Sequence, residues 1–260
     1  LSHIKVMVID EADRLFDMGF QPSIRGILEC ILHRRQTLLF SATMPDDIRR
    51  LVQEILHDPV TIQIGRTAPA VTVSHALYPV GQHLKSALLI ALLRSTETES
   101  VLVFTRTKIR AERVARELQQ AGYSATSLQG NLSQYRRQAA LDGFRAGSVK
   151  VLVATDVAAR GIDVLSISHV INYDMPDGVD DYTHRIGRTG RVDQTGEAFT
   201  LVTSEDATMV HAIEQILNTT LERRVLPGFD YGAPAPNRGP LRSSYPSRRP
   251  RVRTQGMRPR

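Results

Sequence analysis

From residue 76 onward, short apolar runs alternate six times with longer segments in which apolar residues recur at helical spacing. The expected strands lie at 76–80, 100–104, 124–128, 150–154, 168–173 and 196–202. The expected helices lie at 84–94, 107–121, 133–147, 179–187 and 205–217, with a short turn after 155. Such alternation is typical of a mostly parallel sheet covered by helices. The sequence therefore predicts an α/β domain with helices on both faces of its sheet.

The first 66 residues show only part of a second such domain. Strands are expected at 4–9, 36–41 and 59–64, and helices at 21–32 and 46–56. We therefore predict a partial first domain at 1–66 and a complete second domain at 76–226. Residues 67–75, with Thr67, Pro69 and Thr72, read as the linker between them.

The last 34 residues, 227–260, have a composition unlike the rest of the chain. They hold eight arginines, seven prolines and one acid, Asp230, so their net charge is +7. Since the whole chain is +6, the remainder is 6 − 7 = −1. We predict a disordered basic tail that attracts nucleic acid with little sequence preference. The alternative is a solubilising tail without a partner.

The cysteine content and the apolar runs bear on the cellular compartment of the chain and on whether it spans a membrane. Its one cysteine, Cys30, rules out an internal disulfide and fits the cytoplasm, and we expect its side chain to be buried on the helix near 23–32. The longest apolar run, 87–93, is too short to cross a bilayer. The sequence therefore predicts a cytoplasmic protein without a membrane span.

Acidic residues follow the first apolar run of the chain. The run 6–9 reads as a buried parallel strand, and Asp10, Glu11 and Asp13 come directly after it. Ligands of open α/β sheets bind at this end of the strands. Asp10 is placed to hold Mg²⁺ near nucleotide phosphates, and Glu11 to orient or deprotonate a water. The alternative is a helix N-terminus with acids that favour its dipole.

A second polar segment runs from His184 to Arg191. Arginines recur there every three residues, at 185, 188 and 191, with small residues between them. The guanidinium group carries a fixed charge and a planar set of donors that fits phosphate oxygens. The segment indicates phosphate recognition, against the alternative of a solvated basic turn.

Five segments in this order carry a family resemblance over roughly residues 1–220. They are Asp-Glu-Ala-Asp at 10–13, Ser-Ala-Thr at 41–43, Val-Phe-Thr-Arg-Thr at 103–107, Ala-Thr-Asp-Val-Ala-Ala-Arg-Gly-Ile-Asp at 154–163 and His-Arg-Ile-Gly-Arg-Thr-Gly-Arg at 184–191. The chain resembles the DEAD-box family of ATP-dependent RNA helicases, and most closely the bacterial RhlE-like branch. The resemblance implies two RecA-like domains, ATP and Mg²⁺ as cofactors, single-stranded or duplex RNA as partner, and a monomer. It also implies RNA-stimulated ATP hydrolysis coupled to local duplex unwinding.

The P-loop of that family is missing from these residues. A P-loop reads Gly-x-x-x-x-Gly-Lys-Ser/Thr, and none of the four lysines here follows a glycine. We therefore expect a C-terminal piece of a helicase that is inactive alone. Two alternatives are a non-catalytic RNA-binding or annealing module and a DNA helicase of the wider superfamily.

The resemblance also implies roles for single residues in the ATP site and between the domains. Asp10 would hold Mg²⁺ largely through water, and Glu11 would position the hydrolytic water. Asp163 would contact the ATP ribose, whereas Arg188 and Arg191 would be arginine fingers that neutralise charge on the transferred phosphoryl group. The residues expected to couple the domains are Asp13, Ser41, Thr43, His184 and Arg185.

Within that set, Asp13 would link to His184 across the cleft, and Arg185 would hold the interdomain arrangement. Ser41 and Thr43 would tie hydrolysis to strand separation, although simple polar capping after the strand remains open for both. The expected RNA contacts are Thr105, Arg106, Gly130, Gln134, Arg137 and Thr155. For Gln134 and Arg137 a solvated helix start is the alternative. Arg160 would brace the loop that carries Asp163.

Overall fold

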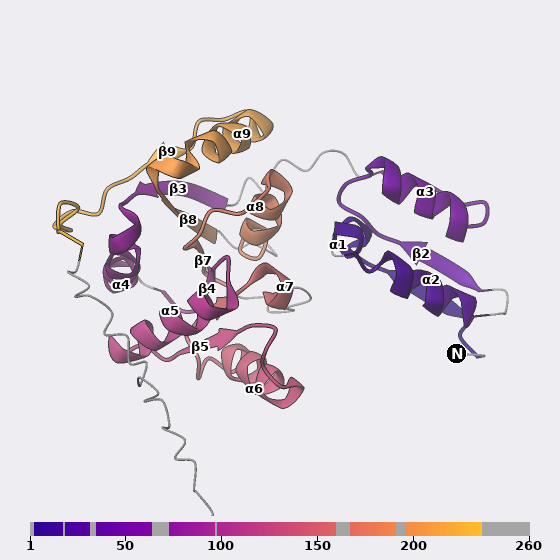
Figure 1. Ribbon diagram of the computed structural model, residues 1–260, viewed down its shortest axis with the longest axis horizontal. Coiled ribbons are helices and arrows are strands. Elements are labelled where there is room, and N and C mark those ends of the chain that lie inside the picture. Colours follow the sequence, from indigo (N-terminus) through magenta and orange to yellow (C-terminus); the bar gives the residue numbers. More distant parts are fainter. Residues whose placement is uncertain are drawn as a thin grey trace, which may run out of the picture. The chain divides into compact units, whose positions relative to one another are not determined.

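The computed structural model of the chain describes residues 3–17, 19–31, 35–63, 73–96, 98–159, 167–190 and 196–235. The chain divides into two compact units, Leu1–Arg66 and Thr67–Arg260 (Figure 1). No helix in the described ranges is both long and apolar enough to cross a membrane.

The described residues of the first unit form a small parallel sheet and three helices. Strand β1 (Val6–Ile9) pairs in parallel with β2 (Gln36–Leu39), with Val6 opposite Gln36. The helices are α1 (Ala12–Asp17), α2 (Gln21–Glu29) and α3 (Asp46–Ile55). Ile9, Ala12, Ile24 and Ile48 form their common core. The side of the sheet on which these helices pack is therefore apolar and closed.

Three expectations for this unit are wrong in detail. Strand β1 is not buried throughout, because Val6 and Val8 are 52% and 55% exposed. No strand forms at 59–63, although Val60 and Ile62 alternate with polar residues as in a strand. A strand needs a hydrogen-bonded neighbour, and none is present beside these residues in the described part of the chain. Cys30 caps the end of α2 and is exposed, because the helix stops one residue before it.

The described residues of the second unit form a seven-stranded sheet in which every paired strand is parallel. The strand order is β5-β6-β4-β7-β8-β3-β9. Its strands are β3 (Val73–Pro79), β4 (Val101–Phe104), β5 (Ala125–Leu128), β6 (Val151–Ala154), β7 (His169–Asn172), β8 (Gly196–Val202) and β9 (Glu222–Arg223). Its α-helices are α4 (Lys85–Ser95), α5 (Lys108–Gln120), α6 (Gln134–Arg145), α7 (Asp156–Ala159), α8 (Val179–Ile186) and α9 (Ala207–Leu217). Short 3₁₀ turns, Gln82–Leu84 and Ser204–Asp206, precede α4 and α9.

Helices cover both faces of this sheet, as the sequence predicts. Val101 and Val103 of β4 pack in one core cluster with side chains of α4 and α5. Leu102 and Phe104 point to the other face and pack with side chains of α6 and α7. The paired residues Val170 and Ala198 continue this second face toward α8 and α9. Strands that are apolar on both sides explain the continuous apolar runs of the sequence.

The chain after β9 does not leave the folded unit at residue 227. Leu226, Phe229, Tyr231 and Ala233 are partly buried against the core cluster of α4 and α5, and we call Leu226–Ala233 the C-terminal strap. The Phe229 and Tyr231 rings lie 4.8 Å apart, and the Tyr231 hydroxyl accepts a hydrogen bond from the Leu226 amide at 2.8 Å. This corrects the expected start of the tail, because two aromatic side chains hold 227–235 on the domain. Residues 236–260 lie outside the described residues.

Truncation separates the strap from the residues beyond it. Deleting 236–260 is expected to leave the melting temperature of the second unit unchanged. Deleting 226–260 also exposes the apolar surface under Phe229 and Tyr231. Burial of this surface in the intact chain stabilises the fold by roughly 2 kcal/mol, and the deletion removes that contribution. For a unit of this size the melting temperature should then fall by about 4–8 °C. Circular dichroism melts of both truncated chains test this, and equal melting temperatures would show that the strap contributes nothing.

Candidate functional site

The acids of the first unit stand at the carboxyl end of β1, where the sequence analysis expects them. Asp10 follows the strand directly and is exposed, and its Oδ1 accepts a hydrogen bond from the Glu11 amide at 2.9 Å. Glu11 itself has a φ of 50°, in the left-handed region that non-glycine residues rarely adopt. Backbone in such a region is often held at functional sites. The strained turn thus presents two carboxylates at one end of the sheet.

Asp13 joins the two polar segments of the first unit. It is 6% exposed, and its Oδ2 accepts hydrogen bonds from the Thr43 amide at 2.8 Å and the Thr43 hydroxyl at 2.9 Å. The Ser41 hydroxyl accepts from the Asp13 amide at 3.1 Å and donates to the Thr43 carbonyl at 2.7 Å. Ser41 and Thr43 therefore hold Asp13 in place. The expected link from Asp13 to His184, which lies in the other unit, stays a prediction.

The donor set around Asp10 fits Mg²⁺ better than a metal with an all-protein cage. Within the described ranges there is no group of three or more His, Cys, Asp or Glu side chains that could hold a metal ion. Mg²⁺ keeps several waters and commonly uses one or two carboxylates together with substrate phosphates. An exposed carboxylate such as that of Asp10 suits this kind of ion.

In the second unit, most of the expected RNA contacts lie at one edge of the sheet. Thr105, Gly130 and Thr155 follow β4, β5 and β6, which are neighbours and run in the same direction. Their carboxyl ends therefore share an edge. Thr105 is fully buried and Thr155 is 6% exposed. Within the described residues, the Thr155 hydroxyl oxygen is buried without a hydrogen-bond partner, which is costly unless a ligand supplies one.

The start of α6 contributes two further candidates to this edge. Gln134 is exposed, whereas Arg137 is partly buried and donates from Nη2 to the Ala158 carbonyl at 2.8 Å. Arg137 therefore ties α6 to α7, which a solvated helix start would not do. A Cβ at Gly130 would meet Lys108 Cε at 3.1 Å, so the glycine leaves room for that lysine.

Arg185 is a buried hub of the second unit. It is 3% exposed, and it forms a two-pronged ion pair with Asp156, through Nε at 2.6 Å and Nη2 at 2.7 Å. Its Nη1 donates to Asn172 Oδ1 at 3.2 Å and to the Asp174 carbonyl at 2.7 Å. The guanidinium also lies 5.1 Å from the centre of the Phe104 ring. These donors of Arg185 are used inside its own unit. The expected interdomain role of Arg185 stays a prediction.

The residues after α8 run close to the first residue of β8. Thr189 is 2% exposed and donates to the Ile167 and Ser168 carbonyls. A Cβ at Gly196 would lie 2.5 Å from the Gly190 nitrogen and 2.7 Å from Thr189 Cγ2, so only glycine fits there. Arg188 follows α8 and is partly exposed, as is His184 on the helix. The expected site residues Arg160, Asp163 and Arg191 lie outside the described residues.

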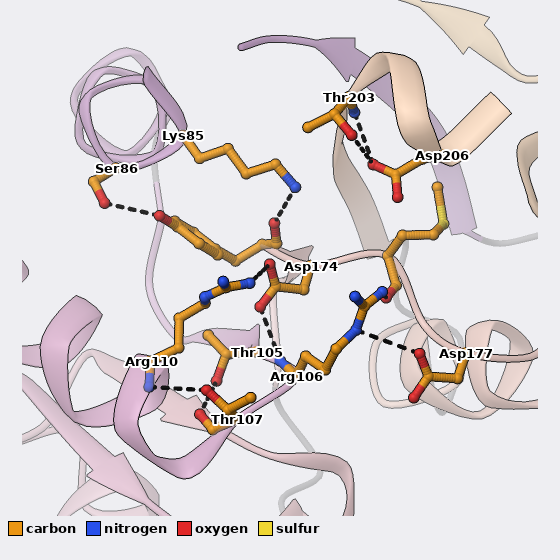
Figure 2. A network of polar contacts seen from close by, with 12 residues as sticks. Lys85, Ser86, Thr105, Arg106, Thr107, Arg110, Asp174, Asp177, Thr203 and Asp206 are labelled. Atoms are coloured by element: carbon orange, nitrogen blue, oxygen red, sulfur yellow. Dashed lines mark hydrogen bonds and ion pairs between the residues drawn. The ribbon is translucent and has the colours of Figure 1, made fainter. Parts of the chain in front are cut away.

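A polar network that the sequence analysis missed lines a cavity of about 840 Å³ at the same edge. Figure 2 shows its centre, Asp174, between Arg110 and Arg106. Asp174 is 3% exposed, and its carboxylate accepts from Arg110 Nη1 at 2.6 Å and from the Arg106 amide at 2.9 Å. The Lys85 ammonium donates to the Tyr173 carbonyl at 2.9 Å, and burial lowers its pKa while nearby Asp174 partly offsets this. A polar residue just after an apolar strand was the available signal for Asp174, as it is for Asp10.

Fold and site together define a class of protein. Parallel sheets with acids, threonines and arginines at their carboxyl ends are typical of nucleotide-driven enzymes with RecA-like domains. Models of two protein families match the chain, the DEAD/DEAH box helicase at residues 1–51 and the helicase conserved C-terminal domain at 84–193. The chain belongs to the DEAD-box family of RNA helicases.

Similar proteins support this assignment. The DEAD-box ATP-dependent RNA helicase CshA of Geobacillus kaustophilus is 41% identical over 231 residues, which are 88% of this chain and 50% of CshA. CshA of Bacillus subtilis is 39% identical over the same length. The chain spans about half the length of the curated relatives it matches. The resemblance to the RhlE-like branch stays a prediction.

Solved structures show the same fold. The E. coli DEAD-box protein SrmB, bound to regulator of ribonuclease activity A, is 38% identical with a TM-score of 0.57, over 59% of this chain and 91% of that one. S. cerevisiae Dbp5 bound to RNA and ADP BeF₃ is 30% identical with a TM-score of 0.78, over 86% of this chain and 60% of that one. The RecA-like fold class predicted from the sequence is therefore confirmed.

Proposed function

We propose that this chain is part of an ATP-dependent RNA helicase, in which RNA-stimulated ATP hydrolysis drives local opening of RNA duplexes. Family membership supports the reaction, and the names of the relatives support RNA as the substrate. We propose a cytoplasmic monomer that binds single-stranded or duplex RNA.

In this proposal the first unit carries the hydrolytic carboxylates. Mg²⁺ bound with ATP supplies positive charge beside the reacting phosphates. Asp10 would hold that ion largely through water, and the neighbouring Glu11 would accept a proton from the attacking water. Arg188 and Arg191 would donate to phosphate oxygens as negative charge develops on them, and Asp163 would accept from the ribose hydroxyls. The Asp13–Ser41–Thr43 network holds the turn that carries the two carboxylates.

The second unit binds the RNA backbone along the edge formed by Thr105, Gly130 and Thr155. The observation that supports this most directly is the buried hydroxyl of Thr155, which has no hydrogen-bond partner among the described residues. A phosphate oxygen arriving at this edge would accept its proton and remove the cost of leaving it unpaired. Contacts of this kind read the backbone rather than the bases, so binding should tolerate many sequences.

The variant Thr155→Val tests this assignment. Valine has nearly the same shape but no hydroxyl, so the fold should be as stable as the parent or slightly more stable. Affinity for a fluorescein-labelled single-stranded RNA, measured by anisotropy, should fall about three- to tenfold, as expected for one hydrogen bond. Thr126→Val, on the neighbouring strand β5, serves as a control and should not change affinity. Unchanged affinity of Thr155→Val would exclude Thr155 as an RNA contact.

Residues 1–260 by themselves are expected to show negligible RNA-stimulated ATP hydrolysis. No lysine in the sequence follows a glycine, so the phosphate cradle of a P-loop is missing from these residues. The same observation favours the second candidate function, a non-catalytic RNA-binding or annealing module. Turnover in the ordinary enzymatic range of about 1–10³ s⁻¹ would contradict this prediction.

A further inference from the structure

The turn that carries Thr105 and Arg106 is held by a residue outside all of the recognised segments. Asp174 follows β7, one strand away from the turn, and its two carboxylate oxygens have different tasks. Oδ2 accepts from the Arg106 backbone amide at 2.9 Å, and Oδ1 accepts from Arg110 on α5 at 2.6 Å. One buried side chain thus fixes the turn on both sides, as Figure 2 shows.

The same short segment also holds the Arg106 side chain. Arg106 donates from Nη2 to the Met175 carbonyl at 3.2 Å and pairs with Asp177 through Nε at 3.3 Å. Lys85 binds the Tyr173 carbonyl on the other side of Asp174. Residues 173–177 are therefore anchored to α4 and in turn set the position of Arg106.

We propose that Asp174 is a positioning residue for RNA binding, which holds the Thr105–Thr107 turn so that Thr105 and Arg106 meet the RNA backbone. The inference rests on the proposed function, because it assumes that this turn contacts RNA. It goes beyond that function because it makes RNA affinity depend on Asp174, although the negative charge of this carboxylate by itself repels RNA phosphates.

Whether Asp174→Asn strengthens or weakens RNA binding distinguishes a positioning role from a purely electrostatic one. The variant Asp174→Asn removes a negative charge beside Lys85, Arg106 and Arg110, so electrostatics alone predicts tighter RNA binding. Positioning predicts the opposite. An amide has one acceptor oxygen where a carboxylate has two, so it cannot hold both the Arg106 amide and Arg110. The turn should then lose its fixed geometry, and with it one phosphate contact.

The test measures binding of a labelled single-stranded oligouridylate to the 260-residue chain at several salt concentrations. Asp174→Asn should bind about tenfold more weakly, as for loss of one charge-assisted hydrogen bond. Its plot of log K against log salt should be less steep by about 0.7, the contribution of one phosphate contact. Affinity equal to or tighter than that of the parent would overturn the inference.

Two control variants test whether a change in charge or a loss of fold stability could explain weaker RNA binding by Asp174→Asn. Asp142→Asn makes the same charge change on the exposed side of α6, where Asp142 pairs with Arg145 at 3.4 Å, and should not weaken binding. Leu118→Ala removes buried core volume from α5, and should lower the melting temperature without changing the salt slope. Equal salt slopes for Asp174→Asn and Leu118→Ala would reduce Asp174 to a merely structural role.

A measurement on the unmutated chain covers the case in which Asp174→Asn does not fold. Hydrogen exchange followed by NMR should show a slowed Arg106 amide, because a buried carboxylate accepts its proton. Exchange at the rate of an unstructured peptide would overturn the inference. If the unmutated chain binds no RNA, the proposed function fails and this inference with it. If that chain binds RNA and Asp174→Asn binds it equally well, only the inference fails.

Discussion

Replacing Arg188 or Arg191 by alanine should lower kcat for ATP by about 10³–10⁵-fold, or roughly 4–7 kcal/mol of barrier. The assay needs a protein that joins these residues to the remaining helicase length seen in the relatives. A guanidinium group that meets the phosphoryl oxygens as their charge grows stabilises the transition state more than the bound ATP. RNA affinity, measured on the same preparations, should change little.

An exposed arginine of the second unit provides the control for this prediction. Arg116 on α5 pairs with Glu112 at 3.9 Å and lies in no recognised segment. Arg116→Ala should leave kcat within a factor of two of the parent, since surface ion pairs contribute only about 0–1 kcal/mol. If Arg188→Ala instead weakens RNA binding while kcat is intact, Arg188 belongs to the RNA site.

The variant Arg185→Met should lower the free energy of unfolding of the second unit by about 3–5 kcal/mol. Its guanidinium is 3% exposed, and its removal leaves Asp156, Asn172 and the Asp174 carbonyl without their shared donor. Unpaired polar groups in such a site are far more costly than a lost surface contact. Urea denaturation followed by circular dichroism measures the effect, since the chain has no tryptophan.

Two comparisons show whether the loss comes from the unpaired partners. Arg113→Met breaks the partly exposed pair of Arg113 with Glu117 at 3.6 Å, and should cost less than about 1 kcal/mol. Adding Asp156→Leu to Arg185→Met removes the unpaired carboxylate and should recover part of the lost stability. A loss as small as that of Arg113→Met would show that Arg185 is not a structural hub.

The regular elements of the second unit could be predicted from the sequence because its strands are buried on both faces. Short apolar runs such as Val101–Phe104 and Val151–Ala154, which lie between predicted helices, are typical of buried strands. The strand expected at 59–64 shows the limit of this reasoning. The alternation of apolar and polar residues there is compatible with a strand. A strand forms only beside a hydrogen-bonded neighbour, however, and the local sequence does not show whether such a neighbour exists. The strap was missed for the opposite reason, because two aromatic rings outweigh a composition rich in glycine and proline.

The sequence predicted most positions of the candidate site. It did not predict the hydrogen bonds and ion pairs that connect these residues. Polar residues just after apolar strands, such as Asp10 and Thr105, are recognisable in the sequence, and Asp174 occupies the same kind of position two residues after β7. The burial of Arg185 inside its own unit was not predicted, although a signal for it was present. Tyr182, Arg185 and Ile186 share one face of α8 at helical spacing, and all three are buried. The position of Arg185 between two core residues on one helix face therefore predicts a side chain that points into the domain.

The close approach of Gly196 to Thr189 and Gly190 has a consequence for genetics. A single added methyl group at position 196 would clash with Thr189 and Gly190 and would push these residues, which follow the proposed finger residue Arg188, away from β8. Such an allele would change no residue that touches ATP or RNA, yet a screen for loss of helicase activity should recover it beside alleles of Arg188 and Arg191. Loss-of-function alleles at 196 should therefore include alanine, the smallest replacement, and suppressors should map to Thr189, whose side chain occupies the space.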